Sequence, residues 1–90
     1  MYNVNVFTLN GCSHCVELKN ILKENKIEFN EFEISQNKEV FDEIVKLTGH
    51  NSLPTTFLQD PETNSGPVFV PGRDYKTKEE LVEKIQNLLK

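Results

Sequence analysis

Within its first 34 residues the sequence changes twice between the hydrophobic spacing of a β-strand and that of an α-helix. Residues 2–9 begin with alternating apolar and polar side chains and end in the less polar Phe7-Thr8-Leu9, which predicts a strand that enters the core. Residues 13–25 have helical spacing, and residues 27–34 are rich in Phe and Ile, which favours a second strand. The expected helical face consists of Cys15, Val16, Lys19, Ile21 and Leu22. A strand, helix and strand within about 30 residues is typical of a crossover between parallel strands.

A second stretch of helical spacing precedes a segment that contains all four prolines. Residues 37–48 repeat apolar side chains at intervals of three and four, which predicts a second helix that ends at Gly49. All four prolines then fall between residues 54 and 71 and exclude a long helix there. Residues 55–59 and 68–70 are predicted to be short strands, because the turn-forming residues between them indicate an antiparallel hairpin.

The end of the sequence predicts a third helix. Thr77 and Glu80 have the spacing of a capping box, and an apolar stripe follows over residues 81–89. The predicted order is βαβ, then the second helix, then ββα. This order predicts an α/β fold with a four-stranded mixed sheet flanked by about three helices. We expect residues 1–90 to form a single domain.

The net charge and the cysteine content limit which classes of partner and which cellular compartment we expect for this protein. Ten basic and 14 acidic residues give a net charge of −4, which provides no broad positive surface for nucleic acid. The N-terminus has no basic segment followed by an apolar one, and no run of about 18 apolar residues occurs, so we expect no export and no membrane partner. Two cysteines close together cannot form the framework of a small secreted domain, which favours the reducing cytoplasm.

The two cysteines form a C-x-x-C motif, Cys12-Ser13-His14-Cys15, where the first predicted strand meets the first predicted helix. The Cys12 sulfur is expected beside the free N–H groups and positive end of that helix, which lowers a thiol pKa and makes Cys12 the nucleophile. A polar or charged His14 would lower it further. Cys15, one turn deeper, is expected to be buried and to attack only after a mixed disulfide has formed.

Two other interpretations of the cysteines compete with redox chemistry. Inert core cysteines are not expected at the solvent-facing end of a strand. A zinc site would need Cys12, Cys15, His14 and His50 together. His14 lies between the cysteines, and His50 belongs to no histidine pair of zinc-finger spacing. We therefore expect no metal site.

Four features together resemble the glutaredoxin family: the strand leading into the C-x-x-C motif, the Leu53-Pro54-Thr55 turn, the hairpin, and Gly72-Arg73-Asp74 before the last helix. The similarity extends over nearly all 90 residues. It implies a thioredoxin-like fold and a glutathione-dependent thiol–disulfide oxidoreductase that reduces protein disulfides and glutathione mixed disulfides through Cys12 and Cys15. Glutathione would be a co-substrate, with no tightly bound cofactor. The resemblance also implies a cis Leu53-Pro54 bond, whereas the base rate for X–Pro bonds in folded proteins favours trans.

The resemblance also implies a glutathione site. The backbone of Leu53 would pair with the cysteine part of glutathione, and Asp74 would meet its γ-glutamyl end. The residues implied are His14, Leu53, Pro54, Gly72, Arg73 and Asp74.

The sequence departs from the family pattern in three respects. Ser13 and His14 stand where many members have Pro-Tyr, and Pro71 replaces the first glycine of a usual pair. Thr8-Leu9-Asn10 lacks the lysine that many members carry before the motif, so Arg73 and Lys76 become candidates for the missing positive charge.

Two further functions stay open beside the expected enzyme. Ser13 in place of proline resembles members that carry a [2Fe–2S] cluster bridged between two chains. The missing lysine also fits an electron donor dedicated to a reductase such as ribonucleotide reductase and recycled by thioredoxin reductase. We expect a cytoplasmic, monomeric enzyme whose partners are glutathione and disulfide-containing proteins.

Overall fold

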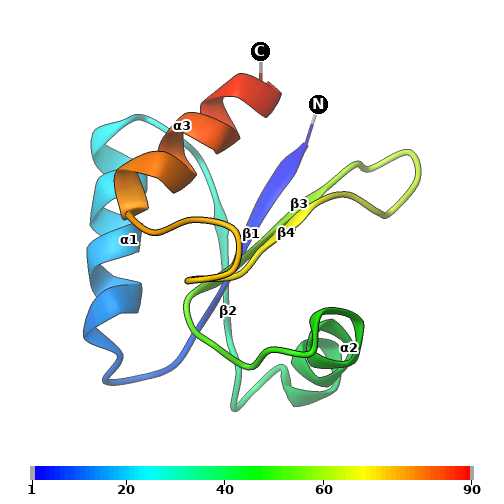
Figure 1. Cartoon of the computed structure of the whole chain (residues 1–90). Coiled ribbons are helices and arrows are strands. Elements are labelled where there is room, and N and C mark those ends of the chain that lie inside the picture. The colour runs from blue at the N-terminus through cyan, green and yellow to red at the C-terminus, as the bar shows by residue number, and fades with distance from the viewer. Residues whose placement is uncertain (1, 90) are drawn as a thin grey trace.

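The computed structural model describes residues 2–89, which form a four-stranded sheet with helices on both faces (Figure 1). The elements in chain order are β1 (Asn3–Thr8), α1 (Ser13–Glu24), β2 (Asn30–Glu33), α2 (Lys38–Thr48), β3 (Thr55–Gln59), β4 (Val68–Phe69) and α3 (Lys78–Leu89). The strand order in the sheet is β2-β1-β3-β4. β1 pairs with β2 in parallel and with β3 antiparallel, and β3 and β4 form an antiparallel hairpin. The predicted α/β class, mixed sheet and hairpin are confirmed.

The central strand β1 is buried from Val4 to Thr8, because helices cover both faces of the sheet. Val4 and Val6 point into a core shared with α1 and α3, whereas Phe7 points into a core shared with α2. Burial on both sides explains why the alternating pattern fades toward Leu9. The carboxyl end of β1 then leads directly into the C-x-x-C motif.

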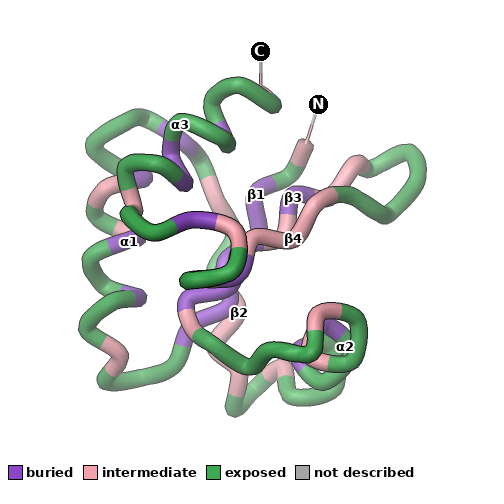
Figure 2. Tube along the Cα trace, viewed as in Figure 1, coloured by how far each residue is buried: buried purple, intermediate pink, exposed green. Residues whose placement is uncertain are grey.

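The two cores differ in size, and Figure 2 shows buried segments where the helices meet the sheet. The larger core consists of Val4, Val6, Leu18, Leu22, Ile27, Leu58, Tyr75, Leu81, Val82 and Ile85. The smaller core, beneath α2, consists of Phe7, Phe41 and Ile44. α1 and α3 contact each other on one face of the sheet. The start of α3 reaches the second turn of α1, because Lys78 bonds to Glu17.

The buried face of α1 differs from the predicted one. Val16 is 50% exposed, whereas Leu18, which the predicted face left out, is fully buried together with Cys15 and Leu22. Residues 15, 18 and 22 follow the three-and-four spacing that puts side chains on one line, and Val16 lies about a quarter turn away. The second strand is also shorter than predicted, because Ile27 packs into the larger core before pairing with β1 begins at Asn30.

No helix within residues 2–89 has both the length and the apolar character needed to cross a membrane.

Candidate active site

The C-x-x-C motif lies at the start of α1, with Cys12 as the residue that caps the helix. The backbone N–H of Cys15 donates a hydrogen bond to the Cys12 sulfur, with N and Sγ 3.2 Å apart. Gly11 has a φ of +85°, a conformation that glycine tolerates best, and it turns the chain so that Cys12 N–H reaches the carbonyl of Leu9 at 3.0 Å. The structure thus places a sulfur where the helix N-terminus would otherwise need a Ser or Asp oxygen.

The two cysteines have different surroundings. Cys12 is half-buried at the surface, whereas Cys15 is 1% exposed. Their Cα atoms are 5.3 Å apart, and their sulfurs are joined in a disulfide. On reduction, the N–H of Cys15 and the positive end of α1 favour a thiolate on Cys12, while burial favours a protonated Cys15. The predicted burial of Cys15 is confirmed.

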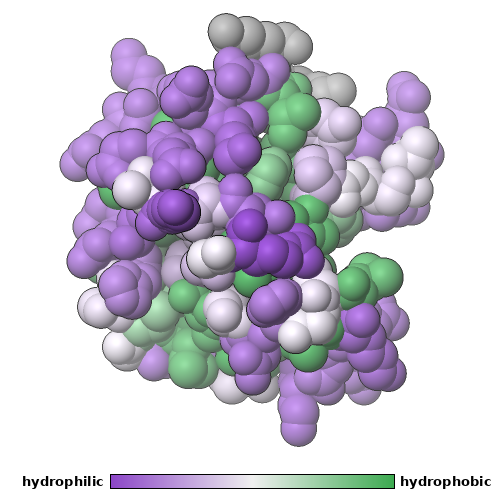
Figure 3. Space-filling view, in the orientation of Figure 1, coloured by the Kyte–Doolittle hydropathy of each residue, from purple (hydrophilic) through white to green (hydrophobic). Residues whose placement is uncertain are grey.

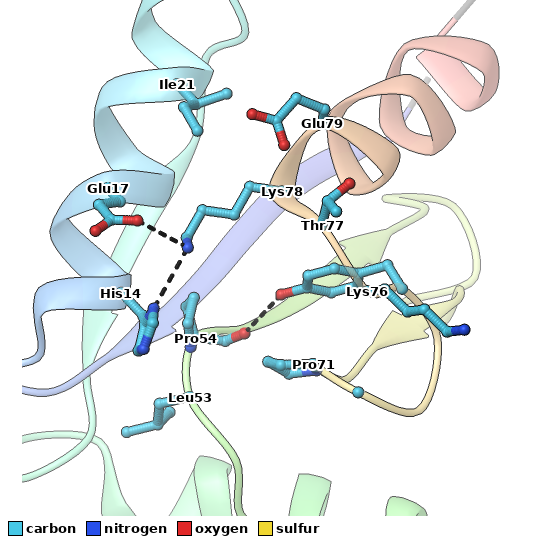
Figure 4. Close-up of a pocket in the computed structure, with 12 residues that line it drawn as sticks. His14, Glu17, Ile21, Leu53, Pro54, Pro71, Lys76, Thr77, Lys78 and Glu79 are labelled. Carbon is cyan, nitrogen blue, oxygen red and sulfur yellow. Dashed lines mark hydrogen bonds and ion pairs between the residues drawn. The ribbon is translucent and has the colours of Figure 1, made fainter.

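A pocket of about 460 Å³ opens next to the motif, between the first turns of α1 and α3 and the loop at Pro54 (Figure 4). Its wall includes four of the residues implied by the resemblance, namely His14, Leu53, Pro54 and Gly72. Arg73 and Asp74 are not among its lining residues. The tertiary structure therefore brings most of the implied glutathione residues together in one cavity.

The loop before β3 is attached to the turn after β4 by Tyr75. The Leu53-Pro54 bond is cis, as the resemblance implied. The buried Tyr75 hydroxyl donates a hydrogen bond to the Pro54 carbonyl, at 3.3 Å. Burial, and to a lesser degree the Asp74 carboxylate, raises the pKa of Tyr75 to about 12, so the hydroxyl keeps its proton at neutral pH. Tyr75 was not predictable from the sequence, because a single tyrosine in a turn belongs to no local pattern.

Arg73 and Asp74 bind each other and the neighbouring backbone. Asp74 Oδ2 accepts hydrogen bonds from Val70 N–H at 2.7 Å and from Arg73 Nε at 2.9 Å. Arg73 Nη2 also donates to the Val68 carbonyl at 3.2 Å. Burial raises the pKa of the Asp74 carboxyl, but the hydrogen bonds from Arg73 and Val70 bring it below its ordinary value. The positive charge of Arg73 is therefore paired with the Asp74 carboxylate within the turn.

A charged group that the sequence analysis missed crosses the pocket from α3 to α1 (Figure 4). Lys78 Nζ lies 2.9 Å from Glu17 Oε2 and 3.4 Å from Nδ1 of His14, inside the C-x-x-C motif. The hydrogen bond from Lys78 lowers the pKa of Glu17. Lys76 belongs to the same wall, but its ammonium points away from these residues. Because Lys78 is 64 positions from His14, no sequence spacing links them.

The surroundings of the motif are partly apolar. Leu9 before it and Val16 after it are both exposed. Figure 3 shows hydrophobic atoms near the end of the molecule where α1 begins, whereas the outer surfaces of α1 and α3 are hydrophilic. Exposed apolar side chains on both sides of the motif suit contact with another protein.

The zinc arrangement considered above is not formed in this structure. Within residues 2–89 no group of three or more His, Cys, Asp or Glu side chains lies in a position to hold a metal ion. His50 lies in the loop after α2, where its backbone bonds to the Thr48 hydroxyl.

Comparisons with known proteins agree with this architecture. The sequence model of a family described as Glutaredoxin matches residues 4–61. The solution structure of Glutaredoxin from Brucella melitensis is 27% identical over all of this chain and 90% of that chain, with a TM-score of 0.69. The crystal structure of the thioredoxin-like protein BC3987 is 22% identical over 96% of this chain and 99% of that chain, with a TM-score of 0.63. A search among curated proteins found no match.

These similarities confirm the thioredoxin-like fold predicted from the sequence. The matched residues 4–61 include both cysteines and Pro54. They end before the segment that carries Tyr75 and Lys78.

Proposed function

The chain belongs to the glutaredoxin family, and from this premise we propose that it is a glutathione-dependent enzyme that reduces protein disulfides and glutathione mixed disulfides. Family membership together with the Cys12–Cys15 pair indicates a thiol–disulfide oxidoreductase. The observation that carries the proposal is the half-buried Cys12 at the helix N-terminus, whose sulfur accepts a hydrogen bond from the backbone N–H of the buried Cys15. Glutathione dependence is supported by the pocket next to the C-x-x-C motif, whose wall includes His14 between the two cysteines.

The proposed reaction is a pair of thiol exchanges. The Cys12 thiolate attacks one sulfur of the substrate disulfide, and the other sulfur leaves as a thiolate that takes a proton from water. Cys15 then loses its proton and attacks the Cys12 sulfur, which releases the second substrate thiol and forms the Cys12–Cys15 disulfide. The substrate disulfide gains two electrons, and the dithiol loses two. Two glutathione molecules then reduce the protein and leave as glutathione disulfide.

We assign glutathione to the pocket whose wall includes His14 of the C-x-x-C motif. The backbone of Leu53 would pair with its cysteine part in the manner of an added strand, with Pro54, His14 and Gly72 forming the wall. Asp74 would accept from the amine of the γ-glutamyl end. Its Oδ2 is used within the turn, but its Oδ1 has no hydrogen-bond partner among the described residues.

One assay with two electron sources tests this function. The protein is supplied either with glutathione and glutathione reductase or with thioredoxin reductase, and NADPH consumption is followed on a glutathione mixed disulfide and on a protein disulfide. We expect turnover of both substrates with glutathione. Turnover only with thioredoxin reductase would instead indicate an electron donor dedicated to one reductase.

A further inference from the structure

The ammonium group of Lys78 is held at the wall of the pocket between α1 and α3 (Figure 4). It donates to Glu17 Oε2 at 2.9 Å and lies 3.4 Å from Nδ1 of His14. An ammonium has three N–H donors, so one is left for a third acceptor. The Lys78 side chain is only 19% exposed, which limits the positions its charge can take.

Lys78 supplies a positive charge beside the C-x-x-C motif, whereas the segment Thr8-Leu9-Asn10 just before the motif contains no basic residue. The guanidinium of Arg73 is paired with Asp74, and the ammonium of Lys76 points away from the motif. Lys78 therefore provides the cation that contacts the C-x-x-C segment from within the pocket wall.

The Glu17 carboxylate can be displaced from the Lys78 ammonium by another carboxylate. Its side chain is 60% exposed, so it can turn into water, whereas Lys78 is held by its packing. An ion pair of this exposure contributes little to stability, because water screens the two charges and both side chains lose freedom when they pair. A carboxylate that is already fixed in the pocket by other contacts can therefore take the place of Glu17 on the ammonium.

We propose that Lys78 binds a carboxylate of the glutathionyl group and that Glu17 competes with this carboxylate for the ammonium. The proposal rests on the glutathione-dependent function above and adds a residue that lies outside the matched region 4–61. It makes the charge on Glu17 a determinant of how tightly carboxylate-bearing disulfides bind.

Competition predicts effects of opposite sign on binding. Lys78→Met removes the cation and is expected to raise the half-saturating substrate concentration about ten-fold, the effect of about 1.4 kcal/mol. Glu17→Gln removes the competing charge and is expected to lower that concentration about three-fold. A pair that only stabilises the contact between α1 and α3 would give effects of the same sign in both variants.

The experiment uses single turnovers, which need no external reductant. Reduced protein is mixed with an excess of an uncharged, capped peptide whose cysteine is linked by a disulfide to glutathione, and peptide thiol release is followed. In the control substrate the same peptide is linked to 2-mercaptoethanol, which has no carboxylate. Both effects are expected with the glutathionyl substrate and not with the control substrate.

Three further variants sharpen the test. In the double variant of Glu17→Gln and Lys78→Met, the gain from Glu17→Gln should disappear, because the ammonium for which Glu17 competes is gone. Lys78→Arg keeps the charge and should bind more tightly than Lys78→Met. Lys76→Met makes the same charge change in the same wall and should have the smaller effect. Melting temperatures show whether each variant is folded.

The outcomes separate this proposal from the function on which it rests. No reaction of the wild type with the glutathionyl peptide would overturn both. Normal wild-type reaction with effects of the same sign for Glu17→Gln and Lys78→Met, or with equal effects on both substrates, would overturn only the competition.

Discussion

Cys12 and Cys15 have chemically identical side chains, but their different environments give them different roles in the proposed reaction. Cys12→Ser removes the sulfur at the helix N-terminus that attacks the substrate in the proposed reaction, so we expect it to abolish all exchange. Cys15→Ser leaves that sulfur in place. We expect it to keep reduction of glutathione mixed disulfides, in which glutathione can resolve the intermediate, and to lose most reduction of intramolecular protein disulfides.

The two substrates must be assayed side by side with both variants. Activity of Cys12→Ser on either substrate would show that the roles of the cysteines are assigned wrongly. Equal loss on both substrates in Cys15→Ser would show that Cys15 does more than resolve a mixed disulfide.

At the level of elements, the start of α3 depends on Thr77. Its hydroxyl accepts a hydrogen bond from Glu80 N–H at 3.2 Å, which confirms the side-chain cap predicted from the sequence. Thr77→Ala is expected to lower the free energy of unfolding by about 1 kcal/mol, because an N–H at the helix end loses its partner. Thr77→Ser keeps the hydroxyl and is expected to change it far less.

Urea unfolding of the wild type and both variants measures this effect. A loss in Thr77→Ser equal to that in Thr77→Ala would mean that the methyl group, and not the cap, stabilises the element. Since Lys78 is the first residue of α3, the cap also orders the backbone from which the Lys78 side chain extends.

At the level of the whole molecule, Tyr75 connects the larger core to the loop at Pro54. Its pKa is raised to about 12, chiefly by burial, from an ordinary value near 10. The folded state thus favours the protonated form. Its contribution to stability is complete below about pH 10 and is lost as the pH rises from about 10 to 12.

Tyr75→Phe removes both the hydrogen bond and this titration. We expect the variant to be less stable than the wild type by about 1 kcal/mol at pH 7, because the Pro54 carbonyl loses its donor. The difference between the two proteins should shrink between about pH 10 and 12. Urea unfolding at a series of pH values measures it, and a constant difference up to pH 12 would contradict the assignment.

The sequence by itself determined the order of the elements and the position of the cysteines. These depend on local signals: the period of the apolar residues, the glycine that ends α2, and the prolines that exclude a helix between residues 54 and 71. The different burial of Cys12 and Cys15 follows from their positions along α1: Cys12 caps the exposed end of the helix, whereas Cys15 begins the line of side chains that packs against the sheet.

Only the tertiary structure decided which charges meet. Arg73 was expected to supply the missing cation but is paired with Asp74, whereas Lys78 reaches Glu17, 61 positions away. It also decided that α1 buries Leu18 in place of Val16. Local spacing places side chains around one helix, but the side that faces the core and the residues it meets depend on how α1 and α3 pack together on the sheet.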